Sequence, residues 1–408
     1  MGAIPPGYEA RGGQLLIGGR SASELAEAAG STPLFVYDLA NVEARVRRFR
    51  AAFPGVSLHY AMKANSYAPL LAEMAKLVDG IDVASAGEMK LALEAGADAS
   101  DISFAGPGKR DAELTAAIDA GVTINLESEG EAERALGIAR ARGRRPRLAV
   151  RVNPDFEIKG SGMRMGGGAK PFGIDAERVP ALVRSLLDNG AEWRGFHIFA
   201  GSQALDPDAL IEAQRATLAL AAELSQAVGE APPLVNLGGG FGIPHFGGEQ
   251  PLDIERVGAA LHDELHRLPP ILAETGFAIE LGRWLVGESG VYLTRIVDRK
   301  ISHGKTFLVT DGGMHHQLAA SGNFGQVIRR NYPVAIAMRM DEEPSEEVTI
   351  VGCLCTPLDR LADDVMAPPA AVGDLVAVFL AGAYGLSASP QAFLGHESAR
   401  EMLVKKGD

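Results

Sequence analysis

The chain has 408 residues, of which 47% are apolar and 22% are charged, an ordinary composition for a folded globular protein. At roughly 100–200 residues per domain, this length allows two or three domains, or one large barrel with an addition. The formal net charge is −13, and the basic residues are scattered apart from a short run at 140–147, which argues against nucleic acid as a partner.

The two cysteines, Cys353 and Cys355, stand two residues apart, a poor disulfide pair and too few thiols for a zinc site, which suits a reducing cytoplasm. The first residues, MGAIPPGYEARGG, contain no apolar core of the signal-peptide type, and no run of 18 apolar residues occurs. The sequence therefore predicts a cytoplasmic protein that has no export signal and does not interact with a membrane.

The N-terminal segment 1–32 contains one strand-like run, GQLLIGG at 13–19, and we expect this segment to join a β domain that follows later in the chain. From residue 57 onward, short β-branched runs alternate with amphipathic segments, the pattern of βα units around a parallel sheet. The helix after the first strand is predicted from Leu70, Leu71, Met74 and Leu77, which share one face, and the longest helix opens near Asp206 or Asp208.

Eight strands are predicted in this region, and eight β/α repeats favour a TIM-type (β/α)8 barrel, which we place at 33–287. The strands are expected at 57–64, 80–85, 101–106, 122–127, 147–153, 195–201, 233–240 and 277–283.

The pattern changes after residue 287, where strand-like runs follow one another with little helical period between them. Residues 288–408 are therefore predicted to form a C-terminal all-β domain. Two long loops are also predicted: a Gly-rich insertion at 153–174, after the fifth barrel strand, and a Pro- and acid-rich loop at 359–374.

Active sites of TIM barrels form at the carboxyl ends of the strands, so reactive residues at these ends are candidates. Lys63 ends the first strand, His197 lies in the sixth, Gly238–Gly240 end the seventh, and Glu280 and Arg283 end the eighth. A solvated lysine, a core histidine or a glycine turn is unremarkable alone. Their convergence on one rim predicts a site for pyridoxal 5'-phosphate.

Each of these residues suits one part of that cofactor. A Schiff-base lysine must lose a proton, which partial burial of Lys63 would promote. Phosphate commonly binds at the loops after strands 7 and 8, where Gly238–Gly240 expose backbone N–H groups and Arg283 adds a charged fork. Glu280 would keep the pyridinium nitrogen protonated, which makes the ring a strong electron sink, and His197 would stack on the ring.

Two competing motifs are weaker. A Walker A loop around Gly304, Lys305 and Thr306 would need a glycine where Arg299 stands. His315 and His316 have neither an H-E-x-x-H pattern nor a carboxylate at ligand spacing. The sequence therefore predicts no metal site, and the role of this histidine pair stays open.

A series of motifs resembles the diaminopimelate/ornithine decarboxylase family, whose members use pyridoxal phosphate and have the alanine-racemase-like fold (fold type III). The resemblance covers residues 33–387, and its end is most similar to the branch associated with exosortase systems, related to decarboxylases of carrier-protein-tethered amino acids. The motifs are YAMKAN, DVASAGE, FAGPGK, RVNPD, KPFGI, HIFAGSQ, NLGGGFGIP, ELGR, DGGM, VGCLC, GAYG, SGNFGQVIRRNYPVAIA and AGAYGLSASPQAFLGH.

This resemblance implies a role for each matching residue. Lys63 would be the Schiff-base lysine, and the family cysteine falls on Cys355, which would enter the site from the partner subunit of an obligate homodimer and donate a proton to the α-carbon. From the residues alone, and not from the resemblance, Cys353 is expected to be a buried structural cysteine. The implied cofactor contacts are Asp82, Arg151, His197, Ser202, Gly238, Gly239, Gly240, Glu280, Gly282, Arg283 and Tyr384, and the implied substrate contacts are Arg283, Thr356, Asp359 and Tyr384.

Three positions depart from the family pattern. Leu281 replaces the proline of E-P-G-R, Thr356 replaces a glutamate that holds the far amino group of diaminopimelate, and Ala319 stands where an arginine binds its distal carboxylate. The Leu281 change is expected to alter a turn and not the chemistry, whereas the changes at Thr356 and Ala319 disfavour diaminopimelate as the substrate. Asp359 could bind a distal amine of the substrate or could simply begin an acidic loop.

The resulting prediction is a decarboxylase that uses pyridoxal phosphate and removes the α-carboxylate of a free amino acid or of an aminoacyl group tethered to an acyl-carrier protein. Diaminopimelate decarboxylase proper, an amino-acid racemase and a non-catalytic pyridoxal-binding protein are the alternatives. The resembling racemases place an arginine at the ring nitrogen, where this chain has Glu280.

Overall fold

The computed structural model describes residues 4–157, 163–164, 167–323 and 329–405. The chain divides into two compact units. The first, called the barrel unit, comprises Val46–Ile243 and Pro251–Gly282, and the second, called the β unit, comprises Met1–Arg45, Pro244–Gln250 and Arg283–Asp408. The predicted domain limits at residues 32 and 287 stay a prediction.

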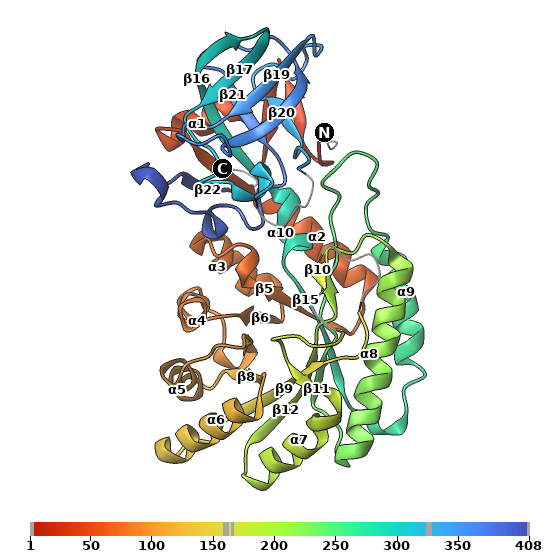
Figure 1. The fold of residues 1–408 in the computed structure, drawn as a ribbon. Coiled ribbons are helices and arrows are strands. Elements are labelled where there is room, and N and C mark those ends of the chain that lie inside the picture. Colours follow the sequence, from red (N-terminus) through yellow and green to blue (C-terminus); the bar gives the residue numbers. More distant parts are fainter. Residues whose placement is uncertain (1–3, 158–162, 165–166, 324–328, 406–408) are drawn as a thin grey trace. The chain divides into compact units, whose positions relative to one another are not determined.

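Eight parallel strands close into a barrel, because β8 pairs with β9 and completes the ring β9-β12-β14-β15-β5-β6-β7-β8 (Figure 1). All eight predicted strands are confirmed. They are β5 (Ser57–Ala61), β6 (Gly80–Val83), β7 (Ile102–Phe104), β8 (Thr123–Leu126), β9 (Arg147–Asn153), β12 (Glu192–Ile198), β14 (Leu234–Asn236) and β15 (Gly276–Leu281).

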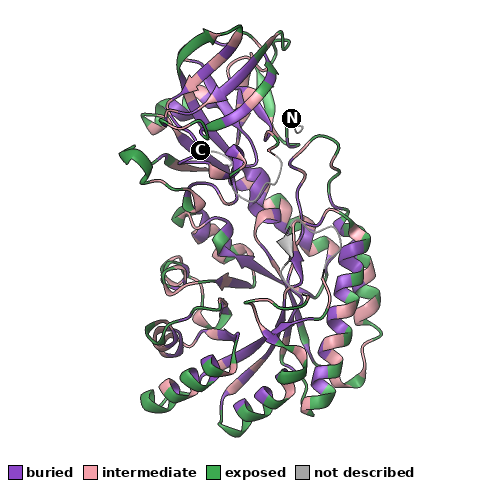
Figure 2. Ribbon diagram, viewed as in Figure 1, coloured by how far each residue is buried: buried purple, intermediate pink, exposed green. Residues whose placement is uncertain are grey.

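Helices surround this barrel and turn their apolar faces inward, as Figure 2 shows by buried strands and by exposed outer helix faces. Leu70, Leu71 and Met74 are fully buried on α3, as predicted. The side chain of Asp206 accepts a hydrogen bond from the Asp208 N–H and so caps the longest helix, α8. The helices are α2 (Leu39–Ala52), α3 (Ala68–Leu77), α4 (Ala86–Glu94), α5 (Asp111–Ala120), α6 (Glu129–Arg142), α7 (Val179–Asp188), α8 (Pro207–Val228) and α9 (Ile254–Leu265).

The β unit contains a mixed sheet in the order β18-β21-β16-β17-β19-β20, and β4 joins it by pairing with β16 and with β22. This arrangement confirms the predicted all-β character of the C-terminal region. The elements are β4 (Leu34–Asp38), α10 (Arg283–Val286), β16 (Gly290–Ser302), β17 (Lys305–Thr310), β18 (Val334–Ile336), β19 (Glu346–Val351), β20 (Arg360–Ala367), β21 (Leu375–Val378) and β22 (Arg400–Val404).

The N-terminal segment forms a small sheet of its own, β1 (Glu9–Arg11), β2 (Gln14–Ile17) and β3 (Arg20–Ser21), followed by α1 (Ala22–Ala29). The Leu15 N–H donates to the Ala337 carbonyl at 2.7 Å, which fastens this sheet within the β unit.

The segment 359–374 was predicted to be a loop, and this was wrong over its first half, because Arg360–Ala367 form strand β20. The apolar side chains of Leu361, Ala362 and Val365 are buried, and β20 pairs antiparallel with β19. The pairing register shifts opposite the acidic residues, and Asp364 has a φ of 47°, so a β-bulge places the acids outside while the apolar residues stay inside.

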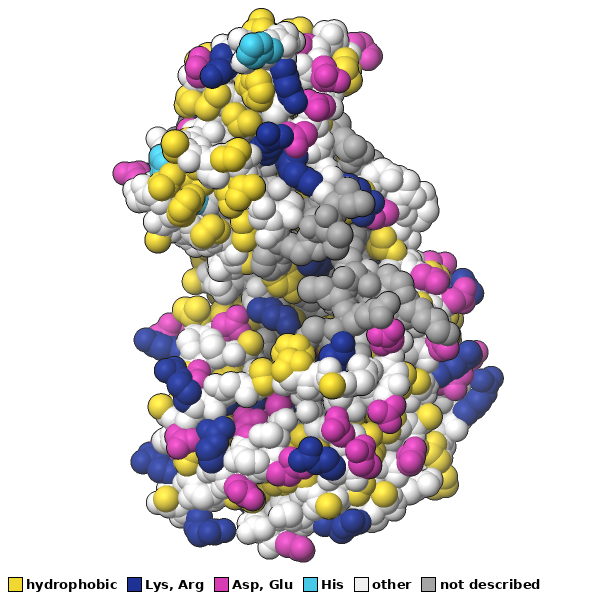
Figure 3. All heavy atoms as spheres, in the orientation of Figure 1, with side chains coloured by type: hydrophobic (Ala, Val, Ile, Leu, Met, Phe, Trp, Pro, Cys, Tyr) yellow, Lys and Arg dark blue, Asp and Glu magenta, His cyan; other side chains and the backbone are white. Residues whose placement is uncertain are grey.

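The Gly-rich insertion predicted at 153–174 lies partly outside the described residues. In its described part, β10 (Met163–Arg164) pairs with β13 (Gly201–Ser202), and β11 (Ile174–Asp175) pairs with β9. None of the helices in the described residues is long and apolar enough to cross a membrane. On the face that Figure 3 presents, basic and acidic side chains are mixed over the barrel unit rather than gathered by sign.

Candidate active site

Lys63 lies in a 3-10 turn, Met62–Ala64, which follows directly from barrel strand β5. The turn is held by the Tyr60 hydroxyl, which donates to the Asn65 carbonyl at 2.7 Å. Met62 and Ala64 are buried, whereas Lys63 itself is exposed. The partial burial expected for this lysine is therefore not present, although its place at the carboxyl end of the first barrel strand is as predicted.

Glu280 of β15 and His197 of β12 are joined inside the barrel, with 2.9 Å between Nε2 and Oε2. Burial alone would raise the pKa of Glu280, but the charge and hydrogen bond of His197, together with the charges of Lys63 and Arg151, lower it to about 2. The Nδ1 atom of His197 is buried and has no hydrogen-bond partner among the described residues. The barrel therefore holds a carboxylate that stays ionised.

A second histidine that the sequence analysis did not select lies beside this pair. His59 of β5 is buried, and its Nδ1 is 3.5 Å from Asp82, one of the residues predicted to line the cofactor. Burial lowers the pKa of His59, but the charges of Asp82 and Glu280 outweigh burial, so that its pKa is raised. The signal was available in the sequence, because His59 and Lys63 stand four residues apart in the strand predicted at 57–64 and would share a face of it.

Arg151 of β9 is buried and donates to Glu127 at 2.9 Å, and its guanidinium lies 5.1 Å from the centre of the Phe172 ring. Glu127 also accepts the N–H groups of Gly106 and Gly173, so it ties three βα loops together. The sequence analysis did not select Glu127. Glu127 holds Arg151 in place: Glu127 directly follows β8, and Arg151 lies in the neighbouring strand β9.

The glycine run after β14 needs glycine for steric reasons. A Cβ at Gly239 would lie 1.8 Å from the Glu280 backbone oxygen, and Gly238 and Gly240 have φ values of 69° and 79°. In the described part of the chain, the N–H groups of Gly239 and Gly240 have no backbone or side-chain acceptor. Ser202 ends β13 and is half-buried. Adjacent donors of this kind form an anion-binding nest.

These residues fit pyridoxal phosphate. The barrel unit supplies a lysine amine, an ionised carboxylate that is hydrogen-bonded to a buried histidine, and a pair of glycine N–H donors, all at the carboxyl ends of strands. Gly282 completes the rim, since a Cβ there would lie 2.9 Å from Ala64 Cβ and would push strand β15 away from the Lys63 turn.

Within the β unit, the two other residues predicted to contact phosphate meet each other. The Arg283 guanidinium lies 4.6 Å from the centre of the Tyr384 ring and 3.4 Å from His245 Nε2. Tyr384 has a φ of 53°, which is uncommon for an aromatic residue and concentrates at functional sites. His245 is buried and was not selected by the sequence analysis.

The remaining predicted site residues of the β unit, the catalytic Cys355 and the substrate contacts Thr356 and Asp359, lie between β19 and β20. Cys355 is exposed, Thr356 is half-buried, and Asp359 is buried with its two oxygens accepting the N–H groups of Met314 and Leu354. Cys353 is half-buried, so the expectation of a buried cysteine was wrong. Burial and the nearby Asp359 charge raise the pKa of its thiol to about 11.

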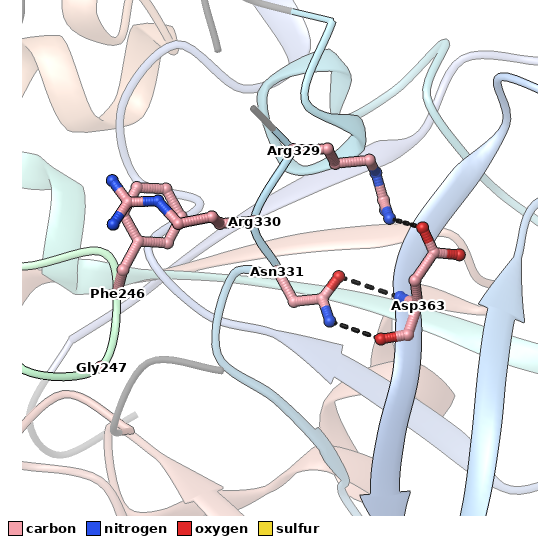
Figure 4. Close-up of a pocket in the computed structure, with 6 residues that line it drawn as sticks. All are labelled: Phe246, Gly247, Arg329, Arg330, Asn331 and Asp363. Atoms are coloured by element: carbon pink, nitrogen blue, oxygen red, sulfur yellow. Dashed lines mark hydrogen bonds and ion pairs between the residues drawn. The ribbon is translucent and has the colours of Figure 1, made fainter. Parts of the chain in front are cut away.

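The β unit also contains a cavity of about 410 Å³ next to Phe246 and the segment 329–331 (Figure 4). The Arg330 guanidinium stacks on the Phe246 ring at 3.7 Å, and Arg329 forms an ion pair with Asp363. Arg330 is also 3.5 Å from Glu249. Each guanidinium is balanced by a carboxylate, so the charge of this cavity does not select an anionic ligand.

The lowered pKa of Glu280 implies that this residue contributes to the free energy of unfolding and that its contribution depends on pH. A carboxylate whose pKa falls on folding contributes stability above the unfolded pKa, and this contribution is lost as the pH falls toward about 2. We expect Glu280→Gln to lower the free energy of unfolding by on the order of 3 kcal/mol at neutral pH. The difference from wild type should shrink as the pH falls from about 4.5, the usual range for glutamate.

Urea unfolding at a series of pH values measures this difference, and Glu133→Gln, on the exposed face of α6, is the matched control. A difference that stays constant down to the lowest pH would show that the Glu280 charge is not responsible.

Comparisons with known proteins point to one family. A family model described as "Pyridoxal-dependent decarboxylase, pyridoxal binding domain" matches residues 39–287. An L-glutamyl-[BtrI acyl-carrier protein] decarboxylase of Niallia circulans is 38% identical, over 92% of this chain and 89% of that protein. A diaminopimelate decarboxylase of Methanothermobacter thermautotrophicus is 34% identical, over 97% of this chain and 91% of that protein.

A solved structure agrees with these sequence matches. The crystal structure of diaminopimelate decarboxylase from M. jannaschii superposes with a TM-score of 0.88 at 26% identity, over 97% of this chain and 92% of that chain. The predicted combination of a TIM-type barrel and a β domain is confirmed.

Proposed function

The chain belongs to the pyridoxal-dependent decarboxylase family and is a decarboxylase that uses pyridoxal phosphate, and we propose that it removes the α-carboxylate of an amino acid tethered to an acyl-carrier protein. The observation that carries this proposal is the similarity to the glutamyl-carrier decarboxylase, at 38% identity over nearly the full length of both chains.

The departures from the diaminopimelate pattern support the same substrate class. Thr356 and Ala319 stand where the resembling diaminopimelate enzymes have a glutamate and an arginine for the distal amino and carboxylate groups. Ala319 is buried, and the Thr356 hydroxyl accepts the Leu358 N–H. A substrate whose far end is attached to a carrier has no free charged end to bind, so neutral residues suit these two positions.

Each of the barrel residues has a separate role in binding the cofactor. Lys63 supplies the amine that holds the cofactor, the glycine N–H groups receive its phosphate, and Glu280, kept ionised by His197, faces the ring nitrogen. Pyridoxal phosphate, when bound, supplies an electron sink for the electron pair that remains on the α-carbon after carbon dioxide leaves. Arg283 and Tyr384 contribute to phosphate binding, and Asp82 and Arg151 line the cofactor's other edge.

The final step returns a proton to the α-carbon, and we assign it to Cys355 of the partner subunit in a homodimer. A thiol suits this task, because its reference pKa of about 8.5 leaves it protonated at neutral pH yet able to release the proton. Cys355 is exposed, as a residue that serves another chain must be. Several large apolar side chains of the β unit are also exposed and would be covered by a second copy: Ile301, Leu358, Val372 and Leu394.

Release of carbon dioxide from matched substrates tests the proposed substrate class. Glutamate and other amino acids are presented either free or loaded on an acyl-carrier protein, and free diaminopimelate is included. We expect kcat/KM for a carrier-loaded substrate to exceed that of the same free amino acid by at least about 100-fold, since the tether contributes binding energy.

The competing function is that of a diaminopimelate decarboxylase, which the 34% identical relative favours. Efficient turnover of free diaminopimelate, with no gain from a carrier, would establish that function and overturn the tethered substrate.

A further inference from the structure

Three separate segments of the β unit bring His315, Cys353 and His396 together. His315 follows β17, Cys353 follows β19, and His396 precedes β22. One donor atom from each residue lies within 4.8 Å of the other two. The Cys353 sulfur is 3.9 Å from His396 Nδ1, and the rings of His315 and His396 have their centres 5.3 Å apart.

The burial of His315 is a second observation, separate from these distances, that indicates a ligand at this cluster. Its side chain is fully buried, and neither ring nitrogen has a hydrogen-bond partner within the described residues. A buried polar group without a partner is costly, and most such groups in proteins are satisfied by protein, water or an ion. An ion coordinated by one nitrogen of His315 would remove part of this cost.

We propose that His315, Cys353 and His396 bind a Zn²⁺ ion, with a fourth coordination position open to solvent. Imidazole nitrogen and thiolate sulfur are both ligand types that zinc binds in proteins, with bonds of about 2.0–2.1 Å to nitrogen and about 2.3 Å to sulfur. In a tetrahedral site these bonds place sulfur and nitrogen about 3.6 Å apart, close to the 3.9 Å between Cys353 and His396. Because His396 is exposed and Cys353 half-buried, the fourth position faces water.

Asp359 fixes the backbone next to two of these ligands, His315 and Cys353. Its carboxylate accepts the N–H of Met314 at 2.6 Å and the N–H of Leu354 at 2.8 Å, the neighbours of His315 and Cys353. A Cβ at Gly313 or Gly352 would lie within 2.2 Å of this carboxylate, so both loops need glycine to close on it. Zinc with one thiolate and two neutral imidazoles carries a net positive charge, which the buried Asp359 would offset.

The neighbouring His316 does not belong to the site. Its Nε2 lies 2.8 Å from the Glu397 carbonyl, and its Nδ1 lies 3.3 Å from the Tyr292 hydroxyl, so both nitrogens are engaged. A different pair could also bind zinc: His262 of α9 and His266, the residue that directly follows this helix, are exposed, and their ring centres are 4.2 Å apart. Any measurement must separate this surface pair from the proposed site.

Zinc binding by the full-length protein, stripped of metal and titrated with zinc chloride against a chromophoric chelator, tests the proposal. Binding exchanges the Cys353 thiol proton for the ion, and no redox change is involved. We expect one tightly bound ion per chain and at least about a 100-fold loss of affinity in Cys353→Ser. Cys355→Ser, two residues away and outside the cluster, is the matched control and should bind zinc as wild type does.

Cobalt(II) provides a second readout that does not depend on enzyme activity. A thiolate-to-cobalt charge-transfer band should appear in wild type and in Cys355→Ser and be absent in Cys353→Ser, with circular dichroism confirming that all three proteins are folded. Unchanged affinity and an unchanged band in Cys353→Ser would overturn the proposal. So would loss of binding only in the His262→Ala, His266→Ala double variant, which would assign the ion to the surface pair.

Discussion

Lys63→Ala should lose the visible absorbance of covalently held pyridoxal phosphate, and its decarboxylase activity should fall by about 10⁴-fold or more. The reason is that the substitution removes the amine from the carboxyl end of β5, where the turn that carries it is fixed by the Tyr60–Asn65 hydrogen bond. Borohydride reduction followed by mass spectrometry gives the direct measurement: wild type should carry the cofactor mass on the peptide containing residue 63, and the variant should not.

Lys90→Ala is the matched control for this experiment, because Lys90 is an exposed lysine of the same barrel unit, on helix α4. It should retain absorbance, adduct and activity. A Lys63→Ala protein that is folded and still carries the reduced adduct at another lysine would refute the assignment.

Mixing two inactive or impaired variants should restore activity if the site is shared between subunits. We expect Lys63→Ala chains mixed with Cys355→Ala chains to recover about a quarter of wild-type activity. Half of the dimers would be mixed, and one of the two sites in each would be intact, with Lys63 from one chain and Cys355 from the other. Activity after subunit exchange measures this recovery, and native mass spectrometry confirms that mixed dimers form.

The control mixture combines Lys63→Ala with Glu280→Ala. Both residues belong to the barrel of one chain, so no mixed dimer restores an intact barrel, apart from any residual activity of Glu280→Ala. Recovery in this control, or its absence in the first mixture despite demonstrated exchange, would place Cys355 outside the site of the partner chain.

The local pattern of apolar and polar residues was enough to predict most of the fold and the main candidate residues. Periodicity of two and of 3.6 residues is a local property, which is why all eight barrel strands and the helices between them were predicted. The carboxyl ends of parallel strands meet on one rim, so Lys63 and Glu280 could be selected without coordinates. The family resemblance added the residues whose patterns are not locally distinctive, such as Arg151 and Tyr384.

The tertiary structure decided what depends on pairs of distant residues. The hydrogen bond between His197 and Glu280 lowers the carboxylate pKa, and it joins two residues that are 83 positions apart in sequence. Strand β20 was missed because its acidic residues lie at a bulge, which only pairing with β19 reveals. The cluster of His315, Cys353 and His396 has no ligand spacing in the sequence, because its members come from three segments that approach one another only when the β unit folds.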